Sequence, residues 1–247
     1  GADNKYSFFP SGALGWVVSK ENFIAENESL SKLVSFLKLR GSYGITGNSP
    51  APYSSLGTIG NYTINLNNQI VKGSGIGGAP NPDLKWERTA QLNIGTDIRM
   101  FNDRLSLTAD WYNKKTTDLL FNVPVSTVSG YSTVTSNIGS VQNRGIELAL
   151  SGDIVRNADF NWNIGAVFSK NRNKVLKLGA TDADVISSGF LGNATILRVG
   201  KPMGSFIGVE RLGTWGTDEV EEAARYGKRP GDIKRNDVNN DGQFDEA

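Results

Sequence analysis

A strict alternation of apolar and polar residues over 84–100 constrains the fold of this chain more than any other feature. Counted every second residue from Leu84, seven of nine side chains are apolar, whereas the intervening series from Lys85 holds none beyond glycine. A period of two is typical of a β-strand with one apolar and one polar face. After the short polar segment 101–104 the alternation resumes from Leu105 to Tyr112, which predicts an antiparallel hairpin.

The length of these two strands separates two possible folds. Strands of soluble domains have about 5–6 residues, and strands that cross a membrane have about 9–11. The polar face carries Glu87, Asp97, Arg99 and Asp110, which is too much charge for a dry interior. The apolar face either meets lipid in the wall of a large barrel or forms the core of a soluble sandwich. The length favours the barrel.

Composition excludes several functional classes. Lysine and arginine total 26 against 25 aspartates and glutamates, which argues against nucleic acid as a partner and against electrostatic docking to a membrane. The chain has no cysteine and no histidine, so thiol chemistry, the commonest general base and the commonest transition-metal ligand are absent. Carboxylate pairs such as Glu219 and Glu222 stand at no useful catalytic spacing, so we expect no enzyme. No run approaches about 18 apolar residues, which excludes a transmembrane helix.

The rest of the chain is predicted to consist of strands joined by connections of unequal length. Further strands are expected over 14–18, 37–48, 146–150, 160–168 and 195–199, with helical turns over 21–36 capped by Ser29. Connections at 19–36, 101–104 and 151–159 fall at one end. Longer ones fall at the other, at 49–83 (with a short hairpin near 62–66), 121–136 and 170–194, and residues from 210 onward are expected to be loop. Outer-membrane barrels sort their connections in this way. We therefore predict an all-β chain whose antiparallel strands form part of a large transmembrane β-barrel.

Several motifs resemble those of the SusC/RagA-type TonB-linked outer-membrane transporters. The first motif is similar to a strand of that family and reads Leu37-Lys38-Leu39-Arg40-Gly41-Ser42-Tyr43-Gly44, then Thr46-Gly47-Asn48, preceded by Phe9-Pro10-Ser11. The second is Trp86-Glu87, Thr89, Asn93-Ile94-Gly95 and Asp97. Further matches follow in family order: Arg104-Leu105, Tyr112, Lys114, Thr116, Asp118-Leu119-Leu120, Asn137, Gly139, Asn143, Gly145, Glu147, Gly200-Lys201-Pro202 and Gly204. Each motif alone is weak, but their common order spans nearly the whole chain.

The resemblance implies a function and partners. Residues 1–247 would be an internal piece of such a barrel, with about six or seven strands, long external loops and no plug domain. The whole protein would import oligosaccharides or peptides across the outer membrane of a Gram-negative bacterium. A SusD-like surface lipoprotein would cap it, and the TonB complex would drive it through an N-terminal part absent here. Two alternatives remain open at this point: a soluble calcium-binding β-sandwich for adhesion or glycan binding, and a passive porin.

A candidate metal site lies near the end of the sequence. Residues 237–245 fit the first nine positions of a calcium loop, with oxygen-bearing side chains at Asp237, Asn239, Asp241 and Asp245 and a glycine at 242. Gln243 would contribute its backbone carbonyl. Position 12, which supplies a bidentate carboxylate, would be residue 248. The alternative is a hydrogen-bonded loop without metal. Oxygen ligands without nitrogen or sulfur favour calcium or magnesium over zinc, and the loop spacing indicates Ca²⁺.

Aromatic residues suggest a second kind of contact. Trp16, Trp86, Trp111 and Trp162 fall on apolar strand faces, which predicts contact with lipid at the membrane interface. Stacking on a sugar is the alternative for these four. Any sugar contact is expected instead from aromatic residues of the loops, namely Tyr53, Tyr62, Tyr131 or Trp215.

Overall fold

The computed structural model of the protein describes residues 5–131, 133–179, 181–189, 192–239, 241 and 242. The chain divides into two compact units, residues 1–182 and 183–247, and each is described by itself. No helix among the described residues is long and apolar enough to cross a membrane.

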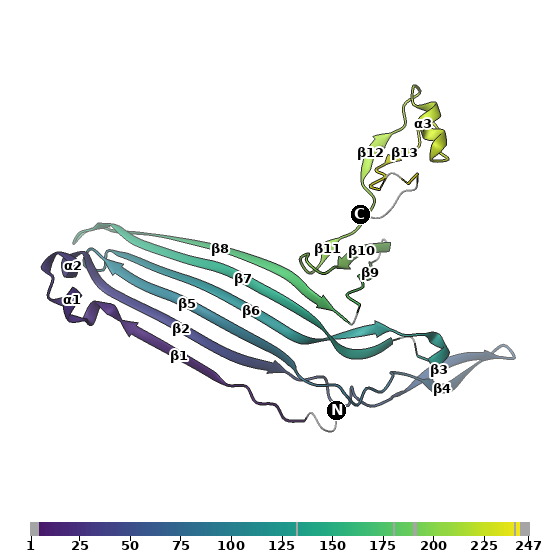
Figure 1. Ribbon diagram of the computed structural model, residues 1–247, viewed down its shortest axis with the longest axis horizontal. Helices are drawn as coiled ribbons and strands as arrows, with labels where there is room; N and C mark the ends of the chain where they lie inside the picture. Colours follow the sequence, from purple (N-terminus) through teal and green to yellow (C-terminus); the bar gives the residue numbers. More distant parts are fainter. Residues whose placement is uncertain (1–4, 132, 180, 190–191, 240, 243–247) are drawn as a thin grey trace. The chain divides into compact units, whose positions relative to one another are not determined.

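The first unit is built on one six-stranded antiparallel sheet in the order β1-β2-β5-β6-β7-β8 (Figure 1). Its strands are β1 (Ser11–Val17), β2 (Val34–Asn48), β5 (Glu87–Met100), β6 (Leu105–Pro124), β7 (Thr133–Arg156) and β8 (Asn161–Leu178). Each strand pairs with the next strand of the sheet along the chain, so the sheet is a meander. The hairpin of β3 (Ile59–Leu66) and β4 (Gln69–Ile76) is inserted between β2 and β5. The β7 strand has 24 residues, about 80 Å at 3.3 Å per residue, well beyond a hydrocarbon layer of about 30 Å.

The register confirms the predicted hairpin and its two faces. Ile94 pairs with Trp111, Ile98 with Leu107 and Met100 with Leu105. Directly paired residues of antiparallel strands point to the same side of a sheet, so these apolar side chains share one face with Leu92. The charged residues Asp97, Arg99 and Asp110 belong to the alternate positions and lie on the other face.

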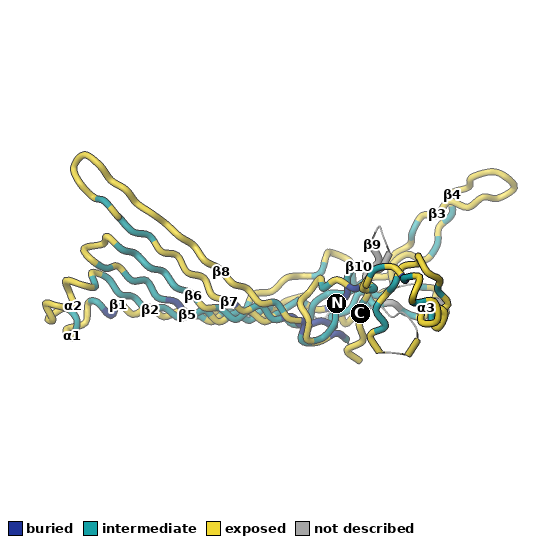
Figure 2. The backbone as a smooth tube through the Cα atoms, turned by 90° about the horizontal axis from the view of Figure 1, so that it is seen from above, coloured by how far each residue is buried: buried dark blue, intermediate teal, exposed yellow. Residues whose placement is uncertain are grey.

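The apolar face of the sheet is open. Ile94 is 54% exposed and Leu148 is 39% exposed, although both lie on inner strands of the sheet, and Phe168 on the edge strand β8 is 53% exposed. Figure 2 shows the six strands in profile as a single layer whose residues are mostly exposed or intermediate. A sandwich would cover this face with a second sheet. A barrel wall instead presents it to lipid, so the architecture favours the barrel and not the sandwich.

The strands extend further than the alternation predicted. Paired strand continues in β6 to Pro124, in β7 from Thr133 and in β8 to Leu178. The prediction of a loop over 121–136 and of an excursion starting at residue 170 was therefore wrong in these parts. In β8 both faces carry polar side chains from residue 170 onward, as at Lys170 and Asn171, and in β6 and β7 the paired segments 121–124 and 133–136 are too short to be separated from the loop between them. The period of two disappears while the backbone ladder continues.

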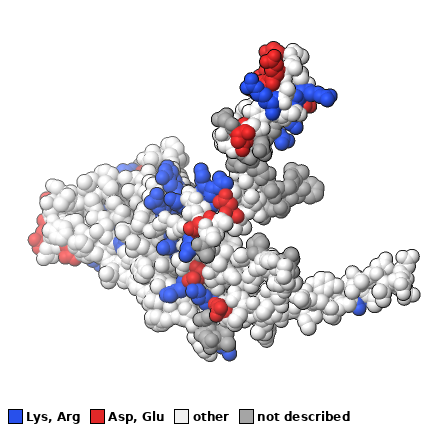
Figure 3. All heavy atoms as spheres, turned by 45° about the vertical axis from the view of Figure 1, so that its right-hand side comes forward, with Lys and Arg blue, Asp and Glu red and all other residues white. Residues whose placement is uncertain are grey.

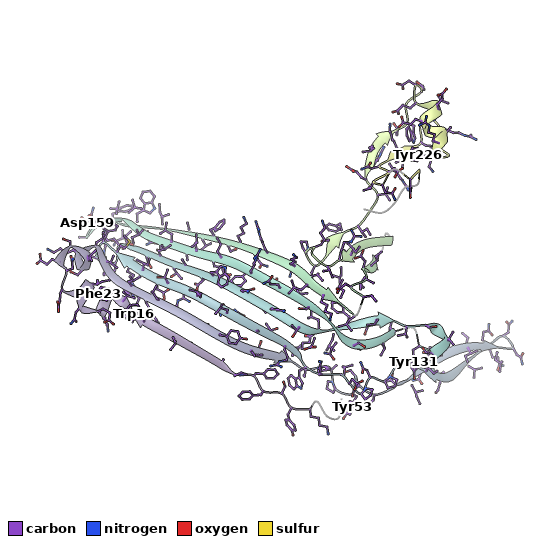
Figure 4. The ribbon with its side chains drawn as sticks, in the orientation of Figure 1. Trp16, Phe23, Tyr53, Tyr131, Asp159 and Tyr226 are labelled. Atoms are coloured by element: carbon purple, nitrogen blue, oxygen red, sulfur yellow. The ribbon has the colours of Figure 1, made fainter. Side chains whose placement is uncertain are left out.

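The connections at one end of the sheet are short. Residues 101–104 form the predicted turn, and Phe101, Asn102 and Asp103 all adopt positive φ. Between β1 and β2 the chain forms η2 (Val18–Lys20), α1 (Asn22–Ala25) and α2 (Glu28–Leu33). The expected cap was wrong by two residues, because the side chain of Asn27 accepts from the backbone N–H groups of Ser29 and Leu30. In Figure 4, Trp16, Phe23 and Asp159 mark this end, and Tyr53 and Tyr131 lie at the opposite end.

The connections at the opposite end begin and end differently from the prediction. The β5 strand begins at Glu87, and Leu84 is fully buried instead of lying on the open apolar face. The β3–β4 hairpin is longer than the hairpin expected near 62–66, and Asn67 and Asn68 turn it with positive φ. Two consecutive residues of positive φ are what a two-residue hairpin loop requires. The β6–β7 connection contains η3 (Thr127–Ser129).

The second unit contains short elements where the sequence predicted mostly loop. They are β9 (Val185–Gly189), β10 (Gly192–Leu197), β11 (Ser205–Phe206), β12 (Arg211–Thr214), α3 (Val220–Arg225) and β13 (Ile233–Arg235). The expected strand at 195–199 corresponds to β10, shifted toward the N-terminus. Residues 211–235 are not all loop, because Trp215 (3% exposed) and Ala223 (fully buried) form a small apolar centre between β12 and α3. Elements of two to six residues are too short to show a period.

The two faces should respond differently to the same substitution. We expect Ile94→Arg to destabilise the protein in a bilayer by about 2–4 kcal/mol, because a guanidinium would be placed against hydrocarbon. Gln91→Arg, three residues along on the opposite face, should be tolerated. Urea unfolding of the full-length protein from lipid vesicles measures both. Equal costs for the two variants would show that the faces are assigned incorrectly.

Candidate functional site

The polar face of the sheet carries a charge network across three strands. Arg40 of β2 donates from Nε to Asp97 Oδ2 of β5 (3.0 Å) and from Nη2 to Asp110 Oδ2 of β6 (2.8 Å). The hydroxyl of Thr108 donates to Asp97 Oδ1 (3.2 Å). The Arg40, Asp97 and Asp110 side chains are 35%, 32% and 25% exposed, so the network is partly screened by water. One guanidinium thus balances two carboxylates and ties β2, β5 and β6 together.

Gly95 makes the space that this network occupies. A Cβ atom at Gly95 would lie 2.3 Å from Asp110 Oδ1 and 2.9 Å from Cζ of Arg40. Both distances are shorter than van der Waals contact, so a side chain at residue 95 would displace the ion pair. The glycine of the Asn93-Ile94-Gly95 motif therefore belongs to the same structural unit as Arg40 of the first motif.

A hollow of about 570 Å³ opens on this polar face next to the network. Amide, hydroxyl and charged side chains from β2, β5, β6, β7 and β8 line it: Arg40, Ser42, Gln91, Asn93, Asp110, Tyr112, Lys114, Asn143, Glu147 and Asn171. Gln91 donates to Asn93 Oδ1 (2.8 Å), and the Tyr112 hydroxyl donates to Asn171 Oδ1 (3.1 Å). Such a surface offers hydrogen-bond donors and acceptors together with charges of both signs.

A second group of motif residues joins the strands where the long connections begin. Glu87 accepts from the Asn48 amide of β2 (2.8 Å) and from the Leu120 backbone N–H of β6 (2.9 Å). We call Asn48, Glu87 and Leu120 the Glu87 clamp. The Asn137 amide donates to the carbonyls of Lys85 (2.9 Å) and Asp118 (2.8 Å). These contacts hold β2, β5, β6 and β7 in register at this end.

The predicted calcium loop is only partly within the described residues. Gln243 and Asp245 lie outside them. Asp237 accepts from the backbone N–H of Gly242 (2.8 Å), and Asn239 Oδ1 accepts from the N–H of Asp241 (3.0 Å). The structure thus brings Asp237, Asn239 and Asp241 into one tight turn with Gly242 at φ +84°. Over the part of the chain that is described, no three carboxylates gather as a metal cluster would require.

This loop rests on the small apolar centre of the second unit. The Tyr226 hydroxyl donates to Asp237 Oδ2 (3.2 Å), and the Tyr226 ring stacks on Trp215 at 5.8 Å between centroids. The Lys234 ammonium lies 4.3 Å from the centre of the Trp215 ring and pairs with Glu219. The backbone N–H of Gly216 and the Lys234 ammonium hold the pKa of Glu219 below its ordinary value.

The aromatic predictions have mixed outcomes. Trp16, Trp111 and Trp162 are exposed on the apolar face as predicted. Trp86 is not, because it precedes β5 and packs against Phe9 at 5.5 Å between ring centroids. The loop residue Tyr53 is exposed. Trp215 is buried and offers no free platform for a sugar.

Sequence reasoning missed the Arg40 network and the polar hollow. The signal that could have found them was present, since Arg40, Asp97 and Asp110 all occupy polar positions of alternating strands. What was missing was the register between β2 and β5, which are separated by 38 residues of connection, 49–86.

Removal of Arg40 should leave two neighbouring carboxylates without their shared partner. We expect Arg40→Gln to destabilise the full-length protein by about 1–2 kcal/mol, a value reduced from that of a buried pair because the groups are partly exposed. A further Asp97→Asn change should recover part of the loss. Arg104→Gln, in the exposed 101–104 turn, is the control and should fall within about 0.5 kcal/mol. Urea unfolding in detergent micelles measures all three. A change of less than 0.5 kcal/mol for Arg40→Gln would contradict the proposed role of the network.

Comparison with known proteins matches these features to one family. The family model described as TonB dependent receptor-like, beta-barrel covers residues 1–245. The chain is 40% identical over 218 residues to TonB-dependent receptor P3 of Formosa agariphila, which covers 86% of this chain and 21% of that protein. It is 34% identical over 189 residues to TonB-dependent receptor SusC of Bacteroides thetaiotaomicron, covering 74% of this chain and 18% of SusC. The chain therefore spans about a fifth of the length of these relatives.

Solved structures agree with the sequence relatives. The RagAB peptide transporter superposes with a TM-score of 0.73 at 32% identity, over 86% of this chain and 22% of that chain. The RagAB peptide importer in its closed-closed state gives a TM-score of 0.75 at 28% identity, over 100% of this chain and 26% of that chain. The open polar and apolar faces, the long strands and these matches lead to one conclusion: the chain belongs to the TonB-dependent receptor-like β-barrel family and is a SusC/RagA-type segment of it.

Proposed function

We propose that this chain forms part of the wall of an outer-membrane transporter that imports oligosaccharides or peptides with energy from the TonB complex. The observation that supports the proposal most directly is the pair of opposite sheet faces. One face is apolar and open across four strands, as lipid contact requires, and the other holds the polar hollow. In a closed barrel that polar face would line the lumen.

The composition of the hollow suits either class of substrate. Gln91, Asn93, Asn143 and Asn171 carry amides, which both donate and accept hydrogen bonds. Peptide groups and sugar hydroxyls need the same combination. Peptide import by RagAB supports a peptide, whereas an oligosaccharide is what the resemblance to SusC-type transporters implies. The role is one of transport and not of catalysis, in keeping with the family.

We propose a SusD-like surface lipoprotein as the partner on the outside. The RagAB relatives are two-component assemblies by name, which supports such a partner. The partner would cover the end of the barrel where the long connections lie. Those connections include the segments 49–86 and 125–131 of the first unit.

Uptake by whole cells tests this function. A strain that lacks the gene should no longer deplete one class of compound from a medium containing defined oligosaccharides and peptides, measured by mass spectrometry. Restoring the full-length gene should restore the depletion, and restoring it in a strain without TonB should not. Depletion that persists without TonB would identify a passive porin and contradict active transport.

We further propose that the 237–245 loop binds Ca²⁺ through Asp237, Asn239, Asp241, the Gln243 carbonyl and Asp245. The proposal is supported by the alternating spacing of the oxygen ligands and by the tight turn that gathers the first three of them. Tyr226 would steady Asp237 from outside the ligand shell, a kind of contact that tunes metal sites.

Isothermal titration of the full-length protein with calcium tests this site. The wild type should release binding heat that is lost in Asp237→Ala and in Asp241→Ala, because each removes a carboxylate ligand. Asp159→Ala, on the exposed β7–β8 turn of the other unit, is the matched control and should leave the heat unchanged. Binding heat that is absent from the wild type, or unaffected by both ligand substitutions, would refute the site.

A further inference from the structure

On β6, β7 and β8, five neighbouring exposed cations lie on the apolar face of the sheet, immediately beyond its apolar rows. We call them the cationic rim, and they are Lys115 of β6, Arg144 of β7, and Lys170, Arg172 and Lys174 of β8. The register fixes their neighbours. Lys170 shares a row with Ile146 and Trp111, Arg172 pairs with Arg144, and Lys174 lies in the row of Gln142 and Lys115. The rim lies toward the strand ends that carry the long connections. In Figure 3 several basic side chains lie together near the centre of the view with some acidic ones beside them, and a broad area next to them is nearly free of charge.

The border between apolar and basic positions follows one straight line across the sheet. The first basic residue on this face is Arg88 in β5, Lys115 in β6, Arg144 in β7 and Lys170 in β8, which is a step of one paired row per strand. One row is two residues, about 6.6 Å, and strands lie about 4.8 Å apart. The line therefore makes an angle of about 54° with the direction perpendicular to the strands, oblique in the same way as the strand tilt of about 35–45° in outer-membrane barrels but steeper. A flat membrane interface crossing tilted strands predicts such a line.

The rim has no counter-charge within the protein as far as it is described. From the row of Met100 to the row of Ala90, the apolar face carries no aspartate or glutamate, whereas Asp97, Asp110 and Glu147 all lie on the opposite face. Asp118, three residues along from Lys115, is already paired with Lys85 at 3.2 Å. Among the described residues, no ion pair within 4.0 Å involves any of the five rim cations.

The direct pairing of Arg144 with Arg172 makes this arrangement costly without a ligand. Cβ atoms of such cross-strand partners lie about 4.5–5.5 Å apart, and like charges in these positions destabilise a sheet. An anion between the two guanidinium groups would remove the repulsion. Phosphate is well suited because guanidinium groups bind it with paired hydrogen bonds.

We propose that the cationic rim binds the phosphate groups of a phosphorylated glycolipid in the outer leaflet of the membrane, with the lipid's acyl chains against Trp111, Ile146 and Phe168. This rests on the proposed outer-membrane function, which places the long connections outside. Along the strands, the rim and the apolar rows follow one another in the same order as the charged groups and the acyl chains of a lipid. Its charged groups would lie toward the loops and its chains toward the short turns. Basic clusters next to an apolar membrane surface attract anionic lipid in this way.

The test measures lipid retained by the full-length transporter in nanodiscs. Nanodiscs of phosphatidylcholine with a fixed fraction of diphosphoryl lipid A are compared with nanodiscs in which the same glycolipid lacks phosphate, and bound lipid is counted by native mass spectrometry. The wild type should retain the phosphorylated lipid and not the other. Arg144→Gln combined with Arg172→Gln should lower retention on the order of tenfold. Lys170→Gln combined with Lys174→Gln should give a comparable loss. This second double variant keeps the test valid if the first one fails to fold.

Lys114→Gln is the matched control. Lys114 neighbours Lys115 on β6 but lies on the opposite face, so retention should equal that of the wild type. Equal retention by the wild type and both double variants would overturn the proposal, as would equal loss from Lys114→Gln. A change of oligomeric state without a change of lipid retention would assign this face to a second copy of the chain and would also overturn it. Loss of lipid with TonB-dependent uptake intact supports the rim and leaves the transport proposal standing, because uptake is measured separately in cells.

Discussion

The need to pair every backbone N–H and C=O group with a neighbouring strand governs this structure. In a hydrocarbon layer no water replaces a missing partner, so a wall of strands must keep its ladder continuous. From Met100 to Arg88 the β5 ladder to β6 runs without a shift. Register shifts elsewhere in the sheet lie toward the strand ends, at Val34/Phe36, near Leu119, at Ser140/Val141 and at Asp153/Val155. A continuous ladder also fixes which side chains share a row, and rows are the units in which the apolar face, the Arg40 network and the cationic rim are built.

A single layer of this kind has no core in the usual sense. Its stability comes from the ladder, from cross-strand pairs and from whatever covers each face. On the polar face Arg40 bridges three strands at once, so the cost of ordering its long side chain is shared by two ion pairs. Gly95 is indispensable to that arrangement because the network occupies the place of its missing side chain. Two motifs far apart in sequence therefore meet at one contact.

The sequence allowed prediction of the strands wherever the two faces differ in polarity, as from Leu92 to Trp111. It failed where both faces carry polar side chains, as in β8 from Lys170, and at the ends of β6 and β7 within 121–136, which were predicted as loop although parts of them remain paired. It also failed for elements of a few residues, such as α3, whose existence depends on the tertiary packing of Trp215 and Ala223. The Arg40 network needed a register that no local pattern contains. The ligands proposed for calcium were readable because they lie within nine consecutive residues.

Because of the Glu87 clamp, the loops beyond it can change without a change in the pairing of the wall strands. Asn48 and Leu120 are held by one carboxylate at the base of the connection between β2 and β5, so the ladder below does not depend on what is inserted above. Lengthening such a closed loop costs only about 0.6 kcal/mol for each doubling. The β3–β4 hairpin is one such insertion, and it leaves the pairing of Asn48 with Glu87 undisturbed. Outer segments of different length and sequence could therefore replace one another on the same wall. Such a replacement would change the compound that is imported without changing how the strands pair.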